Sequence, residues 1–366
     1  MTGRLALRFG ILDHPSQDPS GHKRHSAPTP YLGGVALFLG LIAGSLLVFA
    51  AADGIPIRNF ILTIGAGLGL GLVGLVDDIR PLPRALRLAS QILAAVAAWK
   101  LGFGIETGQG QVLNLLLSVL WIVGITNAFN LLDNMDGVSA GLAGIAAASF
   151  AVMGLLNDLP VLPTIAATLA GASFGFLAHN RHPAKVFMGD AGSLLLGFLV
   201  ALLGLRLRFD NLPEVTFMVP VVVLGLPILD TTLVVLSRIR DGRPVFFGAR
   251  DHVAHRIVRA GLSIKAAVRL MYVAAASLAW LGLVVSRSGP GVAFMLLGFV
   301  GAASLYFGII LWRIPGEDAL APEGTLASPE DIAPSLMKQV SAQPDIDTDP
   351  EANRGSSEEN GLRHEG

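Results

Sequence analysis

The chain has 366 residues, of which 52% are hydrophobic and only 14% are charged, with a formal net charge of −1. Ordinary soluble proteins contain about 25% charged residues, so this composition excludes a soluble domain covered by polar side chains. The absence of cysteine also excludes disulfides and thiolate metal sites. The mean hydropathy is +0.63, and the apolar residues form long runs, which predicts an all-α, polytopic membrane protein.

Charge is unevenly distributed along the chain. Residues 1–32 are polar and no apolar run precedes Gly33, so we expect a cytoplasmic N-terminal segment and no signal peptide. Residues 315–366 contain twelve acidic and three basic side chains, which predicts a disordered cytoplasmic tail without a catalytic role. The remainder has fifteen acidic and 23 basic residues, which suits phosphate substrates and anionic lipids, and nothing predicts nucleic-acid binding.

Residues 33–314 form the expected transmembrane catalytic domain, in which charged or turn-forming residues separate the apolar runs. We expect about ten transmembrane helices, an even number that leaves both termini on one side. The expected spans are 33–52, 58–76, 86–101, 112–129, 138–156, 161–178, 192–207, 216–236, 267–286 and 291–312.

Lys and Arg residues indicate the orientation of these spans. Nearly all of them fall in alternate connections, so that side of the membrane is predicted to be cytoplasmic. The acidic and histidine clusters lie almost entirely on the same side, and ionisable groups at the edge of a membrane helix usually have a function. These connections are 77–85, 130–137, 179–191 and 237–266.

Two acidic clusters follow apolar runs. Asp77 and Asp78 repel each other and need a cation or a proton, unless they simply mark a helix end that faces water. The second cluster suits a hard cation or a phosphate, ribose or base edge, and the alternative is amides that cross-link helices in lipid. If helical, this cluster forms one stripe at i, i+3 spacing: Asn127, Asn130, Asp133 and Asp136.

A third cluster lies at the start of the apolar run 192–207. Gly189 and Gly192 allow close approach of the backbone, and the N-terminal amides of a helix favour phosphate oxygens. Asp190 is the expected metal ligand, and Lys185 is placed to meet phosphate charge.

The fourth cluster occupies the longest basic connection. His252 and His255 are three residues apart and share a face if the segment is helical. Zinc usually takes at least three protein ligands, so the arginines nearby, including Arg243 and Arg256, favour a clamp for a diphosphate. The plain alternative is the positive charge expected of any cytoplasmic loop.

Taken together, these clusters supply carboxylates for Mg²⁺ and basic groups for phosphate beside a membrane. The chain also resembles the polyprenyl-phosphate N-acetylhexosamine-1-phosphate transferases, over residues 22 to about 261 and in that family's order. The matching stretches are HKRHSAPTPYLGG (22–34), GLVDDIRPLPRALRLASQ (74–91), NAFNLLDNMDG (127–137), AKVFMGDAGSLLLGF (184–198), PILDTTLVVLSRIRDGRP (227–244) and RDHVAHRIVRAG (250–261).

The resemblance implies an active site at the cytoplasmic face of a bacterial inner membrane. There a polyprenyl phosphate would displace UMP from a UDP-sugar, with Mg²⁺ or alternatively Mn²⁺ as cofactor, and a homodimer is left open. The implied catalytic residues are Asp77, Asp78, Asp133, Asp136, His252 and His255, and the implied metal ligands are Asp190 and Asp133. The implied substrate-binding residues are Lys23, His25, Asn127, Asn130, Lys185, Arg243 and Arg256.

Three departures from the family's pattern refine the expectation. A first membrane helix normally precedes the HKRH-like segment, Asn134 stands where glycine is common, and the histidine motif reads HVAH. The last difference favours the branch that transfers GlcNAc-1-phosphate to undecaprenyl phosphate, for wall polymers or surface polysaccharides. The alternatives are phospho-MurNAc-pentapeptide transfer and, from another class, a secondary transporter. Transporters carry their key groups near the midplane of the membrane, whereas these acids lie at helix ends.

Overall fold

A computed structural model describes residues 12–13, 29–30, 33–51, 57–159, 161–243 and 251–314. Lys23 and His25, which the resemblance assigns to substrate binding, lie outside the described residues. The acidic tail 315–366 also lies outside them.

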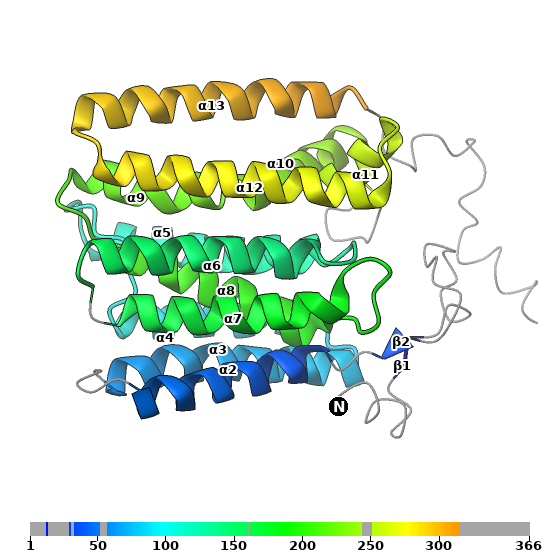
Figure 1. Cartoon of the computed structure of the whole chain (residues 1–366), viewed down its shortest axis with the longest axis horizontal. Coiled ribbons are helices and arrows are strands. Elements are labelled where there is room, and N and C mark those ends of the chain that lie inside the picture. The colour runs from blue at the N-terminus through cyan, green and yellow to red at the C-terminus, as the bar shows by residue number, and fades with distance from the viewer. Residues whose placement is uncertain are drawn as a thin grey trace, which may run out of the picture. The chain divides into compact units, whose positions relative to one another are not determined.

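The described residues are almost entirely helical, which confirms the expected fold class. Most of the helices run side by side along one direction in Figure 1, and a short antiparallel pair joins β1 (Leu12–Asp13) to β2 (Thr29–Pro30). The helices are α2 (Gly33–Ala51), α3 (Ile57–Ile79), α4 (Arg84–Lys100), α5 (Gln111–Leu132), α6 (Val138–Leu156), α7 (Leu162–Asn180), α8 (Gly189–Arg206), α9 (Pro213–Val223), α10 (Gly225–Arg240), α11 (Val253–Arg259), α12 (Ile264–Arg287) and α13 (Pro290–Trp312).

Eight of the described helices are long and apolar enough to cross a membrane, and the pair α9 and α10 makes a ninth span if it is counted as one. The prediction of a single span over 216–236 is wrong in shape, because α9 and α10 meet at an angle of 72°. Pro227 has no N–H to donate to the carbonyl of Val223 four residues earlier, so the hydrogen-bond ladder is interrupted at the bend. The span predicted over 86–101 corresponds to α4, which has 17 residues and is not among the eight.

Helix α8 lies at the centre of the bundle. Its apolar window is 89% buried inside the protein, compared with 6% for α13. The neighbouring helix α3 approaches it closely through Gly74, where a Cβ atom would lie 2.4 Å from the carbonyl oxygen of Asp190. Only glycine permits this approach, which brings the end of α3 against the first turn of α8.

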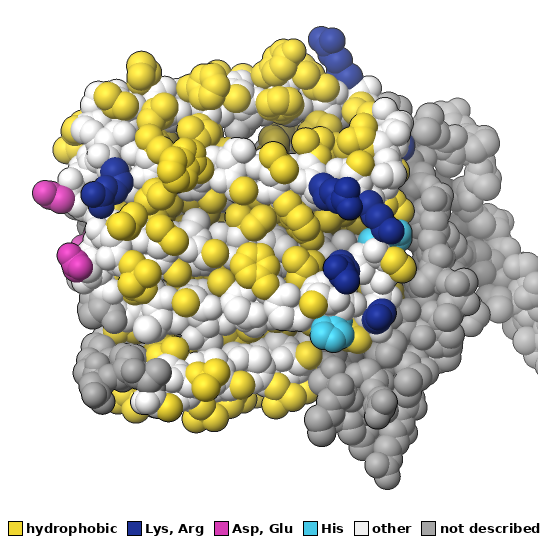
Figure 2. Space-filling model, in the orientation of Figure 1, with side chains coloured by type: hydrophobic (Ala, Val, Ile, Leu, Met, Phe, Trp, Pro, Cys, Tyr) yellow, Lys and Arg dark blue, Asp and Glu magenta, His cyan; other side chains and the backbone are white. Residues whose placement is uncertain are grey.

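The connections that carry the predicted site lie at one end of the bundle. In Figure 1 the C-terminal ends of α3, α5 and α10, the N-terminus of α8 and all of α11 lie toward the right. In Figure 2 most of the visible Lys and Arg side chains lie at that end, whereas the visible Asp and Glu side chains, with one basic side chain beside them, lie at the other. The predicted grouping of basic connections is therefore reproduced by the fold.

Candidate active site

Asp78 holds the first turn of α8. Its Oδ1 accepts a hydrogen bond from the backbone N–H of Asp190 at 2.8 Å, and its Oδ2 accepts from that of Ala191 at 3.0 Å. Gly189, with φ of +70°, brings the chain into this position, and a Cβ atom there would lie 2.6 Å from Asp78 Oδ2. The amides that were expected to bind phosphate are therefore occupied by a carboxylate of the protein, which favours the positive end of the helix dipole in the same way.

Arg87 of α4 connects the two acidic motifs. Its Nη1 donates at 2.6 Å to Asp77 Oδ2 and at 2.6 Å to Asp190 Oδ2. The backbone N–H of Leu82 donates to the other oxygen of Asp77 at 2.6 Å. The carboxylates of α3 and α8 thus converge on Arg87, whose side chain is 31% exposed to solvent.

Asn130 and Asp133 bring the end of α5 to the same place. The Nδ2 of Asn130 donates to Asp190 Oδ1 at 2.8 Å and to the hydroxyl of Ser193 at 2.9 Å. Burial raises the pKa of Asp133 well above its usual range, and the negative charges of Asp190 and Asp78 raise it further. We call Asp77, Asp78, Asp133, Asp190, Arg87 and Asn130 the acidic cluster; it has four carboxylates and one guanidinium.

The stripe expected from Asn127 to Asp136 is only partly present, because α5 ends at Leu132. Asn127 donates to Gln91 of α4 and to the carbonyl of Val123. It therefore links α5 to α4, in agreement with the alternative that these amides cross-link helices. Asp136 lies in the turn after the helix and makes contacts of its own.

Asp136 joins the turn after α5 to the connection before α8. Its Oδ2 lies 2.8 Å from Nδ1 of His182 and accepts from the backbone N–H of Ala184 at 3.0 Å. These contacts fix the backbone beside Lys185, whose side chain is exposed. In this arrangement Asp136 holds the connection before α8 in place, and the Lys185 side chain of that connection is exposed to solvent.

The second group of predicted residues lies in the segment 251–259, which we call the histidine segment. The side chain of His252 is 4% exposed, and its Nδ1 lies 2.7 Å from Asp230 Oδ2. The other oxygen of Asp230 accepts from the backbone N–H of Val253 at 2.6 Å. The ring of His255 is less buried, with its centroid 6.1 Å from that of His252.

Two buried arginines anchor this segment. Arg238 makes a two-bond ion pair with Asp251, with both N–O distances at 2.9 Å. Arg256 is 1% exposed and donates to backbone carbonyls of Asp251 and Leu311 and to the hydroxyl of Ser237. In this geometry Arg256 holds the scaffold, and the substrate-binding role implied for it stays a prediction.

Arg243 lies at the start of the same connection, where its Nη2 donates to Asp241 at 2.8 Å. Arg240 donates to the other oxygen of Asp241 at 2.8 Å, so one carboxylate holds two basic side chains. The histidine segment and the acidic cluster lie at the same end of the bundle (Figure 1).

Several residues that shape the site were missed in the sequence. For two of them the sequence does contain a signal. Arg87 follows the paired aspartates, and Asp230 is a lone charge in an apolar run, where ionisable residues usually have a function. Asn180 and Tyr272 both hold Gly137, the first accepting from its N–H at 3.0 Å and the second donating to its carbonyl at 2.7 Å. No local pattern signals these two, because each partner is distant along the chain.

The acidic cluster has the donor set of a Mg²⁺ site that is completed by phosphate. Mg²⁺ is usually held by one or two carboxylates, several waters and substrate phosphates. Asp190 and Asp133 supply carboxylate oxygens, in a cluster whose negative charge exceeds that of its single arginine. Within the described part of the chain, no group of three or more Asp, Glu or His side chains is arranged to hold a metal ion. A magnesium ion at Asp190 and Asp133 would therefore need ligands from water or substrate, and this site stays a prediction.

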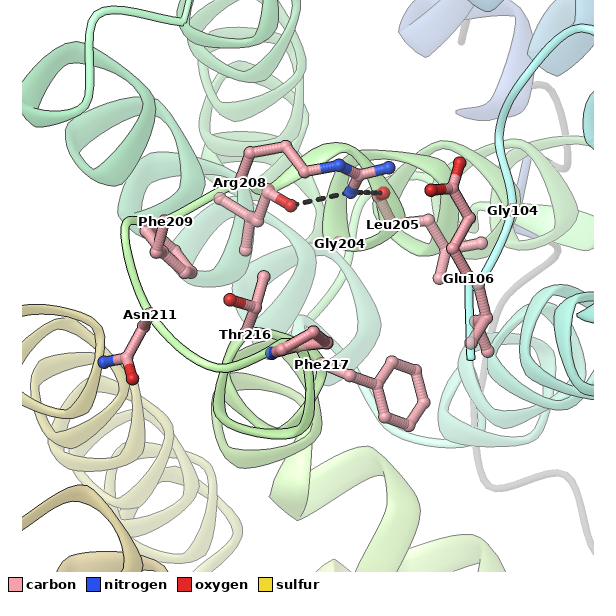
Figure 3. Close-up of a pocket in the computed structure, with 12 residues that line it drawn as sticks. Gly104, Glu106, Gly204, Leu205, Arg208, Phe209, Asn211, Thr216 and Phe217 are labelled. Atoms are coloured by element: carbon pink, nitrogen blue, oxygen red, sulfur yellow. Dashed lines mark hydrogen bonds between the residues drawn. The ribbon is translucent and has the colours of Figure 1, made fainter. Parts of the chain in front are cut away.

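A separate pocket of about 230 Å³ lies at the other end of α8 (Figure 3). It is formed by the connections around Glu106 and Arg208, and Nη1 of Arg208 donates to the carbonyls of Leu205 and Leu207 at 2.7 and 2.8 Å. The 18 residues of α8 separate it from the acidic cluster by about 27 Å at 1.5 Å per residue. The pocket is therefore independent of the predicted site.

Comparison with known proteins identifies the family to which the chain is similar. The family model described as glycosyl transferase family 4 matches residues 60–208, which include Asp77, Asp78, Asp133 and Asp190. The chain is 33% identical over 278 residues to a probable undecaprenyl-phosphate N-acetylglucosaminyl 1-phosphate transferase of Bacillus subtilis, covering 74% of this chain and 75% of that protein.

Two further relatives extend the comparison. A decaprenyl-phosphate N-acetylglucosaminephosphotransferase of Mycobacterium tuberculosis is 32% identical over an alignment that covers 87% of this chain and 86% of the relative. A phospho-N-acetylmuramoyl-pentapeptide-transferase of Heliobacterium modesticaldum is 32% identical over 56% of this chain and 68% of the relative.

A polytopic helical fold with this acidic cluster and these relatives defines a membrane-embedded phosphotransferase. The chain belongs to the polyprenyl-phosphate N-acetylhexosamine-1-phosphate transferase family.

Proposed function

We propose that the protein transfers GlcNAc-1-phosphate from UDP-GlcNAc to undecaprenyl phosphate and releases UMP, at the cytoplasmic face of a bacterial inner membrane. The observation that carries the proposal is the convergence of Asp77, Asp190 and Asn130 through shared hydrogen bonds at the basic end of the bundle. The GlcNAc-1-phosphate transferases among the relatives support the sugar. Both termini are then cytoplasmic, with the 17-residue α4 counted as a crossing beside the nine spans, as the positive charge at this end of the bundle suggests.

In this reaction a phosphate oxygen of the lipid attacks the sugar-linked phosphorus of UDP-GlcNAc. A new phosphorus–oxygen bond forms, the bond to the bridging oxygen breaks, and UMP leaves with the electron pair. A phosphate monoester has a second pKa of about 6, so the attacking group is largely dianionic at neutral pH and needs no strong base. Asp77 and Asp78 are therefore assigned to positioning: Asp77 holds Arg87, and Asp78 holds the backbone of Asp190.

Asp190 and Asp133 are the proposed ligands for Mg²⁺. When bound, the ion supplies neutralisation of the charge that develops on the diphosphate. Asn130 fixes one oxygen of Asp190 at 2.8 Å, which leaves the carboxylate in a defined orientation. The histidine segment, with Arg243 beside it, is proposed to receive the diphosphate and sugar of the donor.

Transfer of phospho-MurNAc-pentapeptide is the second candidate, because one relative with that name covers more than half of the chain. Because the chain belongs to a family of transferases, we prefer an enzyme to the secondary transporter. The two candidate reactions, transfer of GlcNAc-1-phosphate and transfer of phospho-MurNAc-pentapeptide, differ in the UDP-sugar that the protein accepts.

The test is release of UMP by membranes that contain the protein, supplied with undecaprenyl phosphate, Mg²⁺ and a panel of UDP-sugars. We expect turnover with UDP-GlcNAc, dependence on both the lipid phosphate and the ion, and no turnover with UDP-MurNAc-pentapeptide. Asp190→Ala should abolish transfer while the protein remains in the membrane. Asp210→Asn, which changes an exposed carboxylate near the pocket at the other end, is the matched control and should retain full activity. Near-normal turnover by Asp190→Ala would refute the metal assignment, and turnover with the pentapeptide donor alone would select the second candidate.

A further inference from the structure

Asp230 is a fully buried carboxylate within an apolar stretch of α10, with 0% exposure to solvent. A buried charge is costly unless hydrogen bonds satisfy it. Both of its oxygens are satisfied by the histidine segment, at 2.7 Å from Nδ1 of His252 and 2.6 Å from the backbone nitrogen of Val253. This one side chain therefore ties α10 to the first residues of α11.

The contact with His252 does more than join two elements. An ionised carboxylate only accepts hydrogen bonds, so Nδ1 of the ring carries the proton and donates it. In the neutral ring this leaves Nε2 as the unprotonated nitrogen, and the ring cannot turn without breaking the bond. Asp230 thus sets both the tautomer and the orientation of His252.

The rest of the histidine segment is held by other groups. Asp251 is fixed by the two bonds from Arg238, and Arg256 bonds the backbone of Asp251 from the other side. The backbone of the segment is therefore anchored without Asp230. What Asp230 adds is control of the His252 ring and of the first amide of α11, that of Val253, two residues before His255.

We propose that Asp230 is a positioning residue for the sugar-nucleotide half of the reaction. It fixes His252 and the first turn of α11, and this sets the place where His255 meets the diphosphate of the donor. The inference rests on the proposed function, which assigns the histidine segment to the donor. It also predicts an asymmetry: loss of Asp230 weakens the use of the sugar nucleotide and leaves the use of the lipid phosphate unchanged, since both hydrogen bonds of Asp230 go to the histidine segment.

Three substitutions separate the two contacts of Asp230. Asp230→Asn has the same shape and keeps an oxygen for the amide of Val253, but replaces the charged acceptor of His252. Asp230→Ala removes both contacts, and Asp230→Glu restores the charge. Asp210→Asn on the opposite side of the membrane is the matched control.

The experiment measures KM for UDP-GlcNAc and for undecaprenyl phosphate with the full-length protein in membranes. For Asp230→Asn we expect the KM for UDP-GlcNAc to rise by about tenfold, as for loss of one hydrogen bond to a charged group, and the KM for the lipid to stay within about twofold. Asp230→Glu should recover part of the loss. His252→Gln should show a similar rise, and adding Asp230→Asn to it should change the KM little further, because one residue acts through the other.

A fall in turnover with both KM values unchanged would overturn the proposal, since a purely structural role reduces the amount of active protein. Unaltered kinetics in Asp230→Asn, or independent effects in the double variant, would overturn it as well. Amide hydrogen exchange of residues 251–259 without any substrate gives a second readout, and Asp230→Asn should accelerate it locally. If the wild type does not use UDP-GlcNAc, the proposed function fails, and this exchange still decides whether Asp230 positions the segment: unchanged protection would refute it.

Discussion

The acidic cluster and the histidine segment lie at the same end of the bundle but satisfy their charges in opposite ways. In the acidic cluster there are four carboxylates and one arginine, Arg87, which bonds two of them and whose side chain is 31% exposed. In the histidine segment and the part of α10 beneath it, Asp230 and Asp251 are balanced by His252, Arg238 and Arg256, and all five are buried.

This difference in charge balance leads us to expect different consequences of substitution in the two regions. An excess of one charge near solvent leaves room for a cation and a phosphate, and it is maintained at a cost in stability. A buried network with balanced charges has no capacity for a further ion. Removing one member leaves its partner buried without a counter-charge, which lowers the free energy of unfolding. Replacing a charged residue is therefore expected to lower activity in the acidic cluster and to lower stability in the buried network of the histidine segment.

The largest effect on activity is expected at Asp190. Asp190→Asn should lower turnover by about 10³-fold, because the residue is the proposed ligand for the ion that offsets charge in the transition state. The same change removes the charge of one of four crowded carboxyl groups, so the temperature of unfolding should be equal to or above that of the wild type. Activity measured beside a thermal melt in detergent tests both halves, and a melt that falls with activity would contradict the comparison.

The largest effect on stability is expected at Arg238. Burial alone would raise the pKa of Asp251, but the hydrogen bonds and charge of Arg238 lower it below its usual range, so the pair is ionised at neutral pH. Arg238→Met should destabilise the protein by about 3–5 kcal/mol, because it leaves this carboxylate buried without its partner. Chemical denaturation measures the loss, and Arg238→Met combined with Asp251→Leu should recover most of it. If Arg238→Met alone were as stable as the wild type, the expected difference in stability between the two regions would be contradicted.

Gly189 offers an intermediate test. Its φ of +70° is costly for other residues, and an added Cβ atom would lie 2.6 Å from Asp78 Oδ2. Gly189→Ala should cost about 1–3 kcal/mol locally and reduce turnover by about tenfold, since it displaces the carboxylate that holds the amide of Asp190. Gly102→Ala is the control for the backbone conformation alone, because its φ is +86° and no atom lies within 4 Å of the added Cβ. Equal activity in the two variants would show that the contact with Asp78 is unimportant.

The smallest effect is expected at Arg87. Its guanidinium lies between Asp77 and Asp190, so we expect it to compete with the proposed divalent cation for the same oxygens. Arg87→Gln should lower the Mg²⁺ concentration needed for half-maximal thermal stabilisation by about fivefold. Protection from unfolding by Mg²⁺ alone measures this without turnover. An increased requirement for Mg²⁺ would show that Arg87 assists the ion and does not compete with it.

Much of the fold was predictable from the sequence. Apolar runs and basic connections located the helices and grouped their ends correctly, because both depend on composition along a segment. The 72° bend between α9 and α10 was missed, although Pro227 lay within the predicted span. A proline in an apolar run is compatible with a straight or a bent helix, and only packing decides between them.

The site was predictable as a set of residue types and less so as a set of contacts. Asp78 and Asp190 were both chosen as functional, yet the capping of α8 by Asp78 joins residues 112 positions apart. Arg256 was assigned to substrate from its charge, but four of its hydrogen bonds are with the protein. Charge in a sequence does not reveal whether a side chain faces a ligand or a buried carbonyl, because that depends on distant segments.

The central claim is that the acidic cluster and the histidine segment act on one face of the membrane. The absence of native cysteine makes single-cysteine labelling a direct measurement of this claim. Lys185→Cys and Ala260→Cys lie at exposed positions beside the two regions, and Glu106→Cys lies at an exposed position at the other end. With an impermeant maleimide and vesicles of known orientation, we expect the first two to be labelled from the cytoplasmic side and the third only from the opposite side. Labelling of Lys185→Cys and Ala260→Cys from different sides would contradict the account.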